Sequence, residues 1–203
     1  MNLVFDGANS ASKLVQLITA KLPGMFSECV YIIQLLTSSL MIICYHVSGF
    51  RDEAVYYGDQ IFFYKRAQIL VADLWAAFGR QTSLLSEDRK PKTAREALSL
   101  PDINRLTMFP DYRVPQVLVS LKLIKYHDEL REQIRKQQEL PAGSPQEIEI
   151  RAATIQAVEK LREELESQGI SKTSVELDWL LWQRGENAKD EFFPHHRTRT
   201  CFY

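Results

Sequence analysis

The chain has 203 residues, of which 45% are hydrophobic and 25% are charged, the composition of an ordinary soluble globular protein. Its formal net charge is −1, so no overall positive field would hold a nucleic-acid backbone or an acidic membrane surface. Its three cysteines (Cys29, Cys44 and Cys201) have the spacing of neither a disulfide framework nor a zinc site. These totals predict one domain, or one and a half, in a reducing cytoplasm.

One apolar segment departs from this soluble pattern. Between Cys29 and Phe50 the only ionisable side chain besides cysteine and tyrosine is that of His46, and the run is long enough to cross a bilayer as a helix. Polar residues such as Gln34 and Thr37 interrupt it, and no cluster of Lys or Arg flanks it. A buried strand or helix, or a segment foreign to the fold, is therefore favoured over a membrane span. No signal peptide is expected at the N-terminus.

The first strong helical pattern covers residues 64–78, which are apolar on most faces, as in a central helix. Arg66 and Asp73 fall on one side of it, because seven residues make nearly two turns. Two interpretations have equal weight here. The pair is either a buried ion pair that orients the helix or part of a pocket. The polar residues 79–93 that follow predict a loop.

The stretch LTMFPDYRVPQVL, residues 106–118, places Asp111 between an apolar run and a helix start. Pro115 suits the first turn of that helix, because its missing N–H would be unpaired there. The expected buried stripe consists of Val117, Leu118, Leu121 and Ile124. Asp111 is either a helix-capping residue, the commoner role, or a carboxylate that the helix N-terminus keeps ionised for chemistry.

Two further helices are predicted in the C-terminal third. A charged stretch and the loop 141–145 precede an amphipathic helix with Ile155, Val158, Leu161 and Leu165 on one side, which Gly169 ends. Residues 173–176 then have the spacing of a capping box, so another helix begins there and ends near Gly185. These patterns, with no convincing alternating strands, predict an all-α fold.

On the last helix Asp178 and Trp182 share a face with Val175. A buried carboxylate without a partner costs several kcal/mol, so Asp178 either pairs inside the protein or awaits a ligand.

Four stretches together resemble the queuosine salvage proteins, the queuosine 5'-phosphate N-glycosylases/hydrolases. They are FYKRAQILVADLW, LTMFPDYRVPQVL, ELDWLLWQRG and the terminal HHRTRTCFY. The resemblance covers residues 50–203 and the first two dozen residues, and it corresponds to the C-terminal half of the family. It implies a helical fold similar to that of helical DNA glycosylases. It also implies hydrolysis of queuosine 5'-phosphate, which releases queuine for salvage into tRNA modification.

Two departures from the family pattern are visible. Family members are longer on the N-terminal side and carry aromatic base-binding residues there, so this chain is expected to be N-terminally truncated. Residues 25–49 also stand where the pattern would run directly from residue 24 to residue 50. The predicted organisation is an N-terminal helical segment (1–24), an apolar insertion foreign to the pattern (25–49) and a catalytic portion (50–203). The alternative is a truncated, non-catalytic helical variant of the enzyme.

Breaking an N-glycosidic bond builds positive charge on the sugar, which a nearby carboxylate can stabilise. The resemblance points to Asp111 as the catalytic carboxylate. Its neighbours in the same stretch, Phe109, Tyr112 and Arg113, are expected in the substrate site, with Arg113 favouring the ionised form of Asp111. The leaving base is a 7-deazaguanine, so hydrogen bonds to its polar edge must spread the negative charge. Asp178 is a candidate for pairing with N–H groups on this edge or with the amine of queuine, and Trp182 offers a face on which the base can stack.

The 5'-phosphate requires cations or N–H donors. The densest basic cluster is His195, His196, Arg197 and Arg199, and the second is Lys65 and Arg66. The residues chosen from these clusters as substrate-binding are Lys65, His196 and Arg197. The predicted partner is this small nucleotide. A nucleic-acid-binding helical domain is the third possibility, which the net charge disfavours. No cofactor and no metal are expected, because the histidines lack metal-ligand spacing.

Overall fold

The computed structural model describes residues 10–21, 49–79, 98–188 and 190–203. The chain forms two compact units, each built from segments that are separate in the sequence. The first unit combines Met1–Asp52 with Tyr64–Leu106, and the second combines Glu53–Phe63 with Thr107–Tyr203. Most of the predicted insertion and most of the predicted loop after Gly79 lie outside the described residues.

The first unit contains helix α2 (Ala11–Lys21), helix α5 (Lys65–Leu74), the π-helical turn η1 (Trp75–Gly79) and the 3-10 turn η2 (Ile103–Arg105). Helices α2 and α5 pack on each other, and Leu14, Ile18 and Val71 are among their buried side chains. The carboxylate of Asp102 accepts hydrogen bonds from the backbone N–H groups of Ala11 and Ser12. Because it stands at the positive end of α2, Asp102 caps this helix.

The helix predicted over residues 64–78 is confirmed, although its last turn is π-helical. The interpretation of Arg66 and Asp73 as a buried ion pair is wrong, because Asp73 is exposed. The guanidinium of half-buried Arg66 instead lies 5.8 Å from the centre of the Phe50 ring.

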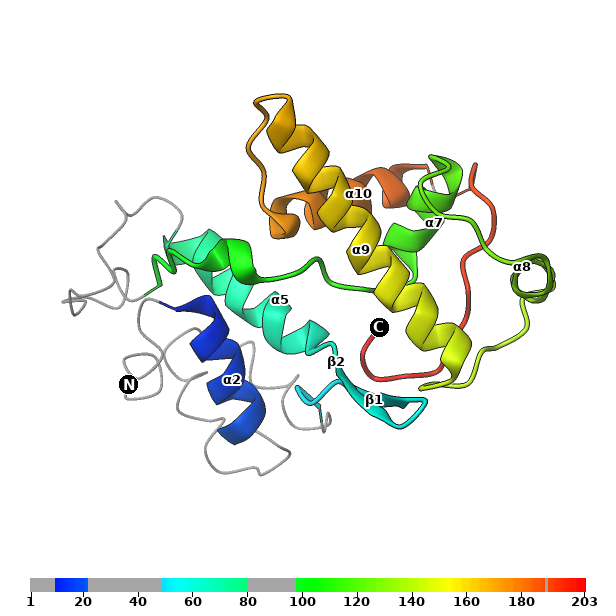
Figure 1. Ribbon diagram of the computed structural model, residues 1–203, viewed down its shortest axis with the longest axis horizontal. Coiled ribbons are helices and arrows are strands. Elements are labelled where there is room, and N and C mark those ends of the chain that lie inside the picture. The colour runs from blue at the N-terminus through cyan, green and yellow to red at the C-terminus, as the bar shows by residue number, and fades with distance from the viewer. Residues whose placement is uncertain (1–9, 22–48, 80–97, 189) are drawn as a thin grey trace. The chain divides into compact units, whose positions relative to one another are not determined.

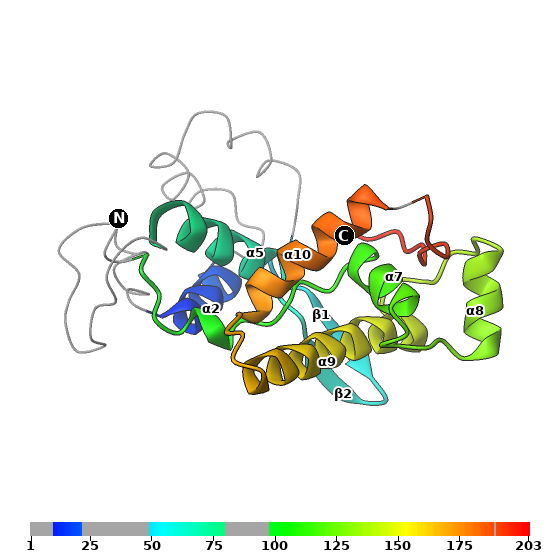
Figure 2. The same ribbon diagram turned by 90° about the horizontal axis from the view of Figure 1, so that it is seen from above.

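The second unit is mainly helical (Figures 1 and 2). Its helices are α7 (Arg113–Ser120), α8 (Asp128–Arg135), α9 (Pro145–Ser167) and α10 (Ser174–Asn187). Helices α7, α9 and α10 pack against one another, and their common core consists of Met108, Val114, Val117, Leu118, Val158, Leu177 and Leu181. A smaller cluster of Tyr126, Ile134, Leu140 and Ile150 lies toward α8. The burial of these apolar faces is the main force that holds the three helices together.

A two-stranded antiparallel hairpin also belongs to this unit, so the all-α prediction is correct only in its main part. Strands β1 (Glu53–Tyr56) and β2 (Asp59–Phe62) pair with Glu53 opposite Phe62. The turn residues Tyr57 and Gly58 both have positive φ angles, 48° and 97°, as a two-residue hairpin turn of type I′ requires. The hairpin gave no alternating signal in the sequence, because neither short strand alternates between buried and exposed positions.

Helix α7 is shorter than the apolar stripe predicted. Pro115 lies in its first turn as expected, and Val117 and Leu118 are fully buried. The helix ends at Ser120, however, and Leu121 is 37% exposed. The two distal members of the predicted stripe therefore belong to the following turn, where Ile124 still packs against the core.

The local signals for α9 and α10 are confirmed. Ser144 caps α9 and accepts a hydrogen bond from the backbone of Glu147, with Pro145 at the first helical position. Gly169, at φ 80°, follows the end of α9. At α10, Thr173 and Glu176 form the reciprocal capping box that their spacing predicts.

We predict that Thr173→Ala lowers the free energy of unfolding by about 1 kcal/mol. The hydroxyl of Thr173 accepts the N–H of Glu176 at 3.2 Å, and alanine leaves that donor at the helix end without its side-chain partner. Urea unfolding of the wild type and the variant measures the difference. The exposed Ser171→Ala serves as the control and should change stability little. Equal stability of Thr173→Ala and wild type would contradict the prediction.

Candidate functional site

Asp111 lies in the loop before α7 and is 7% exposed. One of its carboxylate oxygens, Oδ1, accepts the backbone N–H groups of Arg113 and Val114, each at 2.9 Å. These are donors at the positive end of the helix, where a negative charge is stabilised. The geometry therefore makes Asp111 a capping residue and at the same time gives its carboxylate a fixed orientation in a buried position.

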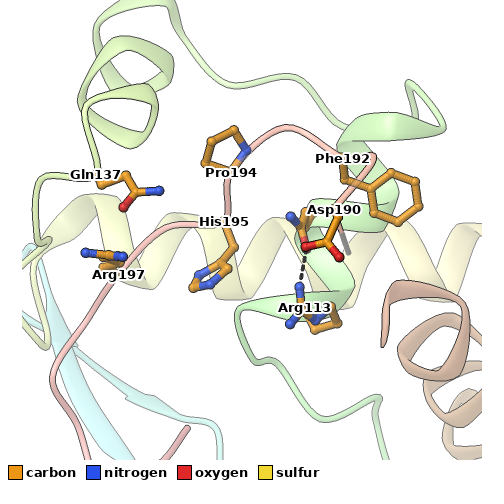
Figure 3. A pocket seen from close by; sticks show the side chains of 8 residues that line it. Arg113, Gln137, Asp190, Phe192, Pro194, His195 and Arg197 are labelled. Atoms are coloured by element: carbon orange, nitrogen blue, oxygen red, sulfur yellow. Dashed lines mark hydrogen bonds between the residues drawn. The ribbon is translucent and has the colours of Figure 1, made fainter. Parts of the chain in front are cut away.

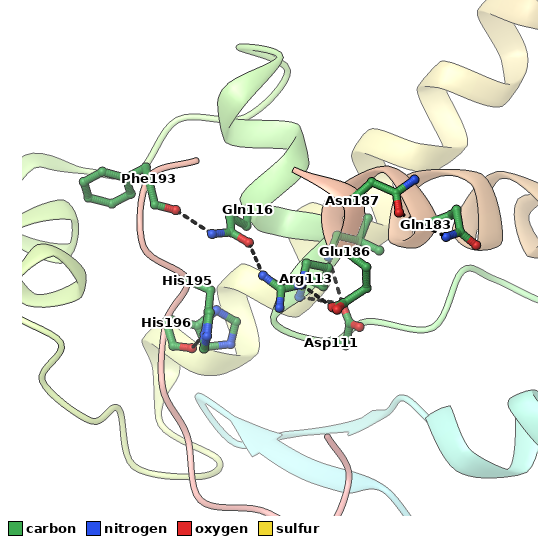
Figure 4. A network of polar contacts seen from close by, with 10 residues as sticks. Asp111, Arg113, Gln116, Gln183, Glu186, Asn187, Phe193, His195 and His196 are labelled. Carbon is green, nitrogen blue, oxygen red and sulfur yellow. Dashed lines mark hydrogen bonds and ion pairs between the residues drawn. The ribbon is translucent and has the colours of Figure 1, made fainter. Parts of the chain in front are cut away.

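The side chain of Arg113 is buried between α7 and α10. Its Nε donates to Glu186 at 2.6 Å, and its Nη1 donates to Gln116 at 2.6 Å. Gln116 in turn donates from Nε2 to the backbone carbonyl of Phe193 at 2.8 Å. This polar network, shown in Figure 4, joins α10 through α7 to the C-terminal segment. Sequence reasoning did not identify Glu186 or Gln116, because their partners are known only once the helices are packed.

Gly185 gives the stem of Arg113 the space that it needs. A Cβ atom at Gly185 would lie 2.6 Å from Cγ and 2.7 Å from Cδ of Arg113, and 2.9 Å from a methyl group of Val117. The sequence predicted that α10 ends near this glycine, but the helix continues to Asn187. Gly185 is therefore a packing position inside the helix and not its end.

Asp178 holds the loop that leads to Asp111. Its Oδ1 accepts the backbone N–H of Phe109 at 2.9 Å, and both residues are buried. Of the two alternatives predicted for Asp178, internal pairing holds for its Oδ1 oxygen. Trp182, placed on the same helical face by the sequence, is 43% exposed. The indole therefore lies at the edge of the buried surface that contains Asp178.

Tyr112 contacts two aromatic side chains of the C-terminal segment. Its ring centre lies 4.6 Å from that of His195 and 6.4 Å from that of Tyr203. The guanidinium of Arg113 lies 5.3 Å from the centre of the Tyr112 ring. These contacts bring the terminal HHRTR motif beside the Asp111 loop, although more than 80 residues separate them in the sequence.

His196 is 1% exposed and belongs to a buried polar cluster. Its Nε2 lies 3.2 Å from the hydroxyl of Tyr203, which donates to Glu147 at 2.6 Å. Glu147 also lies 3.6 Å from Arg151. Burial, with a smaller contribution from the positive charges of His195 and Arg151, lowers the pKa of His196 to about 4. His196 is therefore neutral near pH 7 and anchors the C-terminal segment to α9.

A pocket of about 280 Å³ lies next to this segment (Figure 3). Its lining residues come from α7, the turn after α8, and the C-terminal segment: Arg113, Gln116, Gln137, Asp190, Phe192, Pro194, His195 and Arg197. Of the residues predicted from the sequence, Arg113 and Arg197 line it. The neighbouring His195, left out of the predicted site in favour of His196, lines it as well.

The remaining predicted site residue, Lys65, belongs to the first unit. It is 8% exposed, and its backbone N–H donates to Asp52 at 3.3 Å. Within the residues that the structure describes, no group of three or more His, Cys, Asp or Glu side chains has the arrangement of a metal site.

Among the described helices, none combines the length and the apolar character needed to cross a membrane. The apolar run from Cys29 to Phe50 lies almost entirely outside the described residues.

Comparison with known proteins gives consistent matches. The family model of the queuosine salvage protein matches residues 24–203. A queuosine 5'-phosphate N-glycosylase/hydrolase of Dictyostelium discoideum is 48% identical over 76% of this chain and 44% of its own length. Proteins of the same name from Mus musculus and Bos taurus are 36% and 34% identical, over 93% and 100% of this chain. The chain covers 54% and 59% of those two proteins, so it spans about half the length of the curated relatives it matches.

We predict that Gly185→Ala destabilises the second unit by about 1–3 kcal/mol, the usual cost of overpacking. The added methyl group must displace the stem of Arg113, although alanine is the better helix former. Urea unfolding measures the change, and Asn187→Ala, two residues further on the exposed side of α10, is the control. A Gly185→Ala variant as stable as wild type would contradict the prediction, because it would show that α7 and α10 accommodate the added methyl group without loss of stability.

We also predict that acid weakens the fold through His196. Its pKa is lowered from 6.5 to about 4 in the folded protein, so the unfolded chain binds the proton more readily between these values. Stability is fully present above pH 6.5 and falls as the pH approaches 4. Between pH 7 and pH 5 the loss from this group is about 2 kcal/mol.

Urea unfolding of the wild type and His196→Gln at both pH values tests this. The variant should lose less stability than the wild type on acidification, whereas His127→Gln, at an exposed position in another part of the second unit, should behave as the wild type does. The same pH dependence in all three proteins would contradict the assignment to His196.

Proposed function

Because the chain belongs to the queuosine salvage protein family, we propose that it hydrolyses the N-glycosidic bond of queuosine 5'-phosphate and releases queuine for salvage into tRNA modification. The names of the matched relatives support this reaction. The single structural observation that carries it is the buried carboxylate of Asp111, fixed by the first N–H groups of α7.

The chemistry of the bond explains what Asp111 contributes. Departure of the base leaves a cation-like sugar, whose charge a carboxylate stabilises or whose anomeric carbon it attacks. It can also draw a proton from the attacking water. A carboxylate that is already oriented needs no reorganisation as this charge develops. The two N–H bonds to Asp111 provide that orientation, and this is why a capping position suits catalysis.

The leaving base is proposed to lie against Phe109, Tyr112 and Trp182, with its polar edge toward Asp178. The hydrogen bond from the backbone N–H of Phe109 supports this arrangement, because it keeps the Asp178 carboxylate beside the loop that carries Phe109. The exposure of the Trp182 indole leaves one of its surfaces open to a base. We further propose that the buried positive charge of Arg113 helps keep the carboxylate of Asp111 ionised.

Several broader features remain proposals. The complete protein is proposed to have a fold similar to that of the helical DNA glycosylases, which the mainly helical second unit supports. For this chain we propose three segments: an N-terminal helical segment (1–24), an apolar insertion (25–49) and a C-terminal helical catalytic portion (50–203). The nucleotide is the proposed partner, with no nucleic acid, and the cytoplasmic location stays a prediction.

A non-catalytic helical protein of this family is the second candidate, because the match spans 44% of the length of the Dictyostelium discoideum protein. The two candidates differ in one measurement, which is release of queuine from queuosine 5'-phosphate by the purified chain. If the chain is the hydrolase, the purified protein releases queuine. If it releases no queuine under conditions in which the Dictyostelium discoideum protein does, the second candidate holds.

We predict that Asp111→Asn reduces the rate of queuine release by far more than tenfold while folding and nucleotide binding are retained. Asparagine keeps an oxygen that can accept the two N–H groups but carries no negative charge. Chromatographic detection of queuine measures the rate, and the exposed Asp128→Asn is the charge-matched control. Turnover by Asp111→Asn within about tenfold of wild type, roughly 1.4 kcal/mol in barrier height, would remove Asp111 from the catalytic role.

A further inference from the structure

The side chain of Tyr203 connects helix α9 to the loop that carries Asp111. On the α9 side, its hydroxyl donates to the carboxylate of Glu147 at 2.6 Å. On the loop side, its ring meets the ring of Tyr112 edge to face, with the two ring centres 6.4 Å apart. Tyr112 directly follows Asp111 in the chain. Tyr203 therefore links α9 to the residue next to the proposed catalytic carboxylate.

The hydroxyl of Tyr203 both donates and accepts a hydrogen bond. A carboxylate oxygen only accepts, so the single hydroxyl proton of Tyr203 is directed to Glu147. The hydroxyl oxygen then accepts from Nε2 of His196, 3.2 Å away, which assigns the proton of the neutral imidazole to Nε2. Glu147 and His196 are buried, so water does not readily replace these bonds. The hydroxyl end of the Tyr203 side chain is thereby fixed.

Glu147 is itself held in place by two other groups. Its second oxygen, Oε2, accepts the backbone N–H of Gly143 at 3.2 Å. Its Oε1 lies 3.6 Å from Nη1 of Arg151, one turn further along α9. The guanidinium of Arg151 in turn lies 5.6 Å from the centre of the Tyr203 ring, within the range of a cation–π contact. Tyr203 is thus attached to α9 both at its hydroxyl and at its ring.

The ring of Tyr112 is contacted by two side chains of the C-terminal segment. The ring centre of His195 lies 4.6 Å from that of Tyr112, and Tyr203 makes the second contact. Both distances are typical of aromatic pairs, which favour particular ring orientations. Tyr112 is half-buried, so only part of its surface is open to a ligand. Loss of the Tyr203 ring would allow the Tyr112 ring to turn away from the base that it is proposed to contact.

We propose that Tyr203 is a positioning residue, whose ring, held by Glu147 and His196, keeps Tyr112 in the orientation that contacts the base. Tyr203 acts through Tyr112 and needs no contact with the reacting bond. Binding of the base at Tyr112 rests on the proposed function, whereas the dependence of the Tyr112 ring on Tyr203 does not. Contact with the base acts on the ground state and the transition state alike, so loss of the Tyr203 ring should raise KM and leave kcat nearly unchanged.

The first experiment follows the Tyr112 ring in the purified chain without ligand, by NMR of ring-labelled tyrosine. Tyr112→Phe identifies its signals. Tyr203→Leu removes the contacting ring and should shift these signals, whereas Tyr203→Phe keeps that ring and should shift them less. The control is Phe202→Leu, which removes a half-buried ring from the adjacent residue. Unchanged Tyr112 signals in Tyr203→Leu, or equal shifts in Phe202→Leu, would overturn the proposal.

The second experiment measures queuine release from queuosine 5'-phosphate by the same variants. Tyr203→Leu should raise KM by about three- to tenfold, the size of one aromatic contact, with kcat nearly unchanged. Tyr203→Phe loses the bonds to Glu147 and His196 and therefore stability, but its ring keeps the contact with Tyr112, so KM should rise less. Phe202→Leu should leave KM nearly unaltered.

A merely structural role of Tyr203 gives a different result. In that case KM stays unchanged while both Tyr203 variants remain folded, or it rises equally in Tyr203→Phe and Tyr203→Leu. Either result would overturn the proposal, and so would a loss confined to kcat.

Calorimetry separates this proposal from the hydrolase function. Here the Kd of queuosine 5'-phosphate replaces KM, so the measurement does not require that the chain releases queuine. Weaker nucleotide binding by Tyr203→Leu, without queuine release by the wild type, would support the positioning role and count only against the hydrolase function. An unchanged Kd in Tyr203→Leu would overturn the positioning role even if the wild type releases queuine. Absence of nucleotide binding to the wild type would overturn both.

Discussion

A buried guanidinium has to be paired, and in this protein that requirement fixes how α7 and α10 meet. The side chain of Arg113 is 9% exposed and pairs with Glu186 from the facing helix. Removing Glu186, whose own side chain is 30% exposed, would leave the buried charge of Arg113 without its ion-pair partner, which is destabilising. Gly185 is the position on α10 that lets the stem of Arg113 approach closely enough to form this pair. Apolar burial supplies most of the stability of this packing, and the ion pair fixes how α7 and α10 are oriented against each other beside the proposed catalytic loop.

The C-terminal segment is held at the same place by a second set of polar contacts. Gln116 connects Arg113 to the carbonyl of Phe193, and Tyr203 connects His196 to Glu147 on α9. Between these two attachments His195 packs on Tyr112, next to Asp111. Because both attachments are buried or half-buried, the segment is part of the helical unit. Its basic side chains consequently have fixed positions relative to the Asp111 loop.

What the sequence could predict was determined by local chemistry. The capping box at Thr173, the role of Pro115 in the first turn of α7 and the end of α9 near Gly169 each depend on neighbours within a few residues. The roles of Glu186 and His195 depend on contacts across about 70 to 80 residues, which no local pattern encodes. Gly185 illustrates the difference. In sequence, a glycine that ends a helix cannot be distinguished from one that makes space for a side chain of a packed helix, as Gly185 does for Arg113.

The two interpretations of Asp111 offered by its sequence are compatible, and the structure explains why. A capping carboxylate is bound through its negative charge by N–H groups that cannot move away. The same charge, held in a buried position, is what a cationic transition state requires. Had the Asp111 loop been free to move, its carboxylate would have to be oriented anew in each turnover of the proposed reaction. The hydrogen bond from the backbone N–H of Phe109 to Asp178 holds the preceding part of the loop and so prevents such movement. Capping and the proposed catalytic role thus impose the same geometric demand on Asp111.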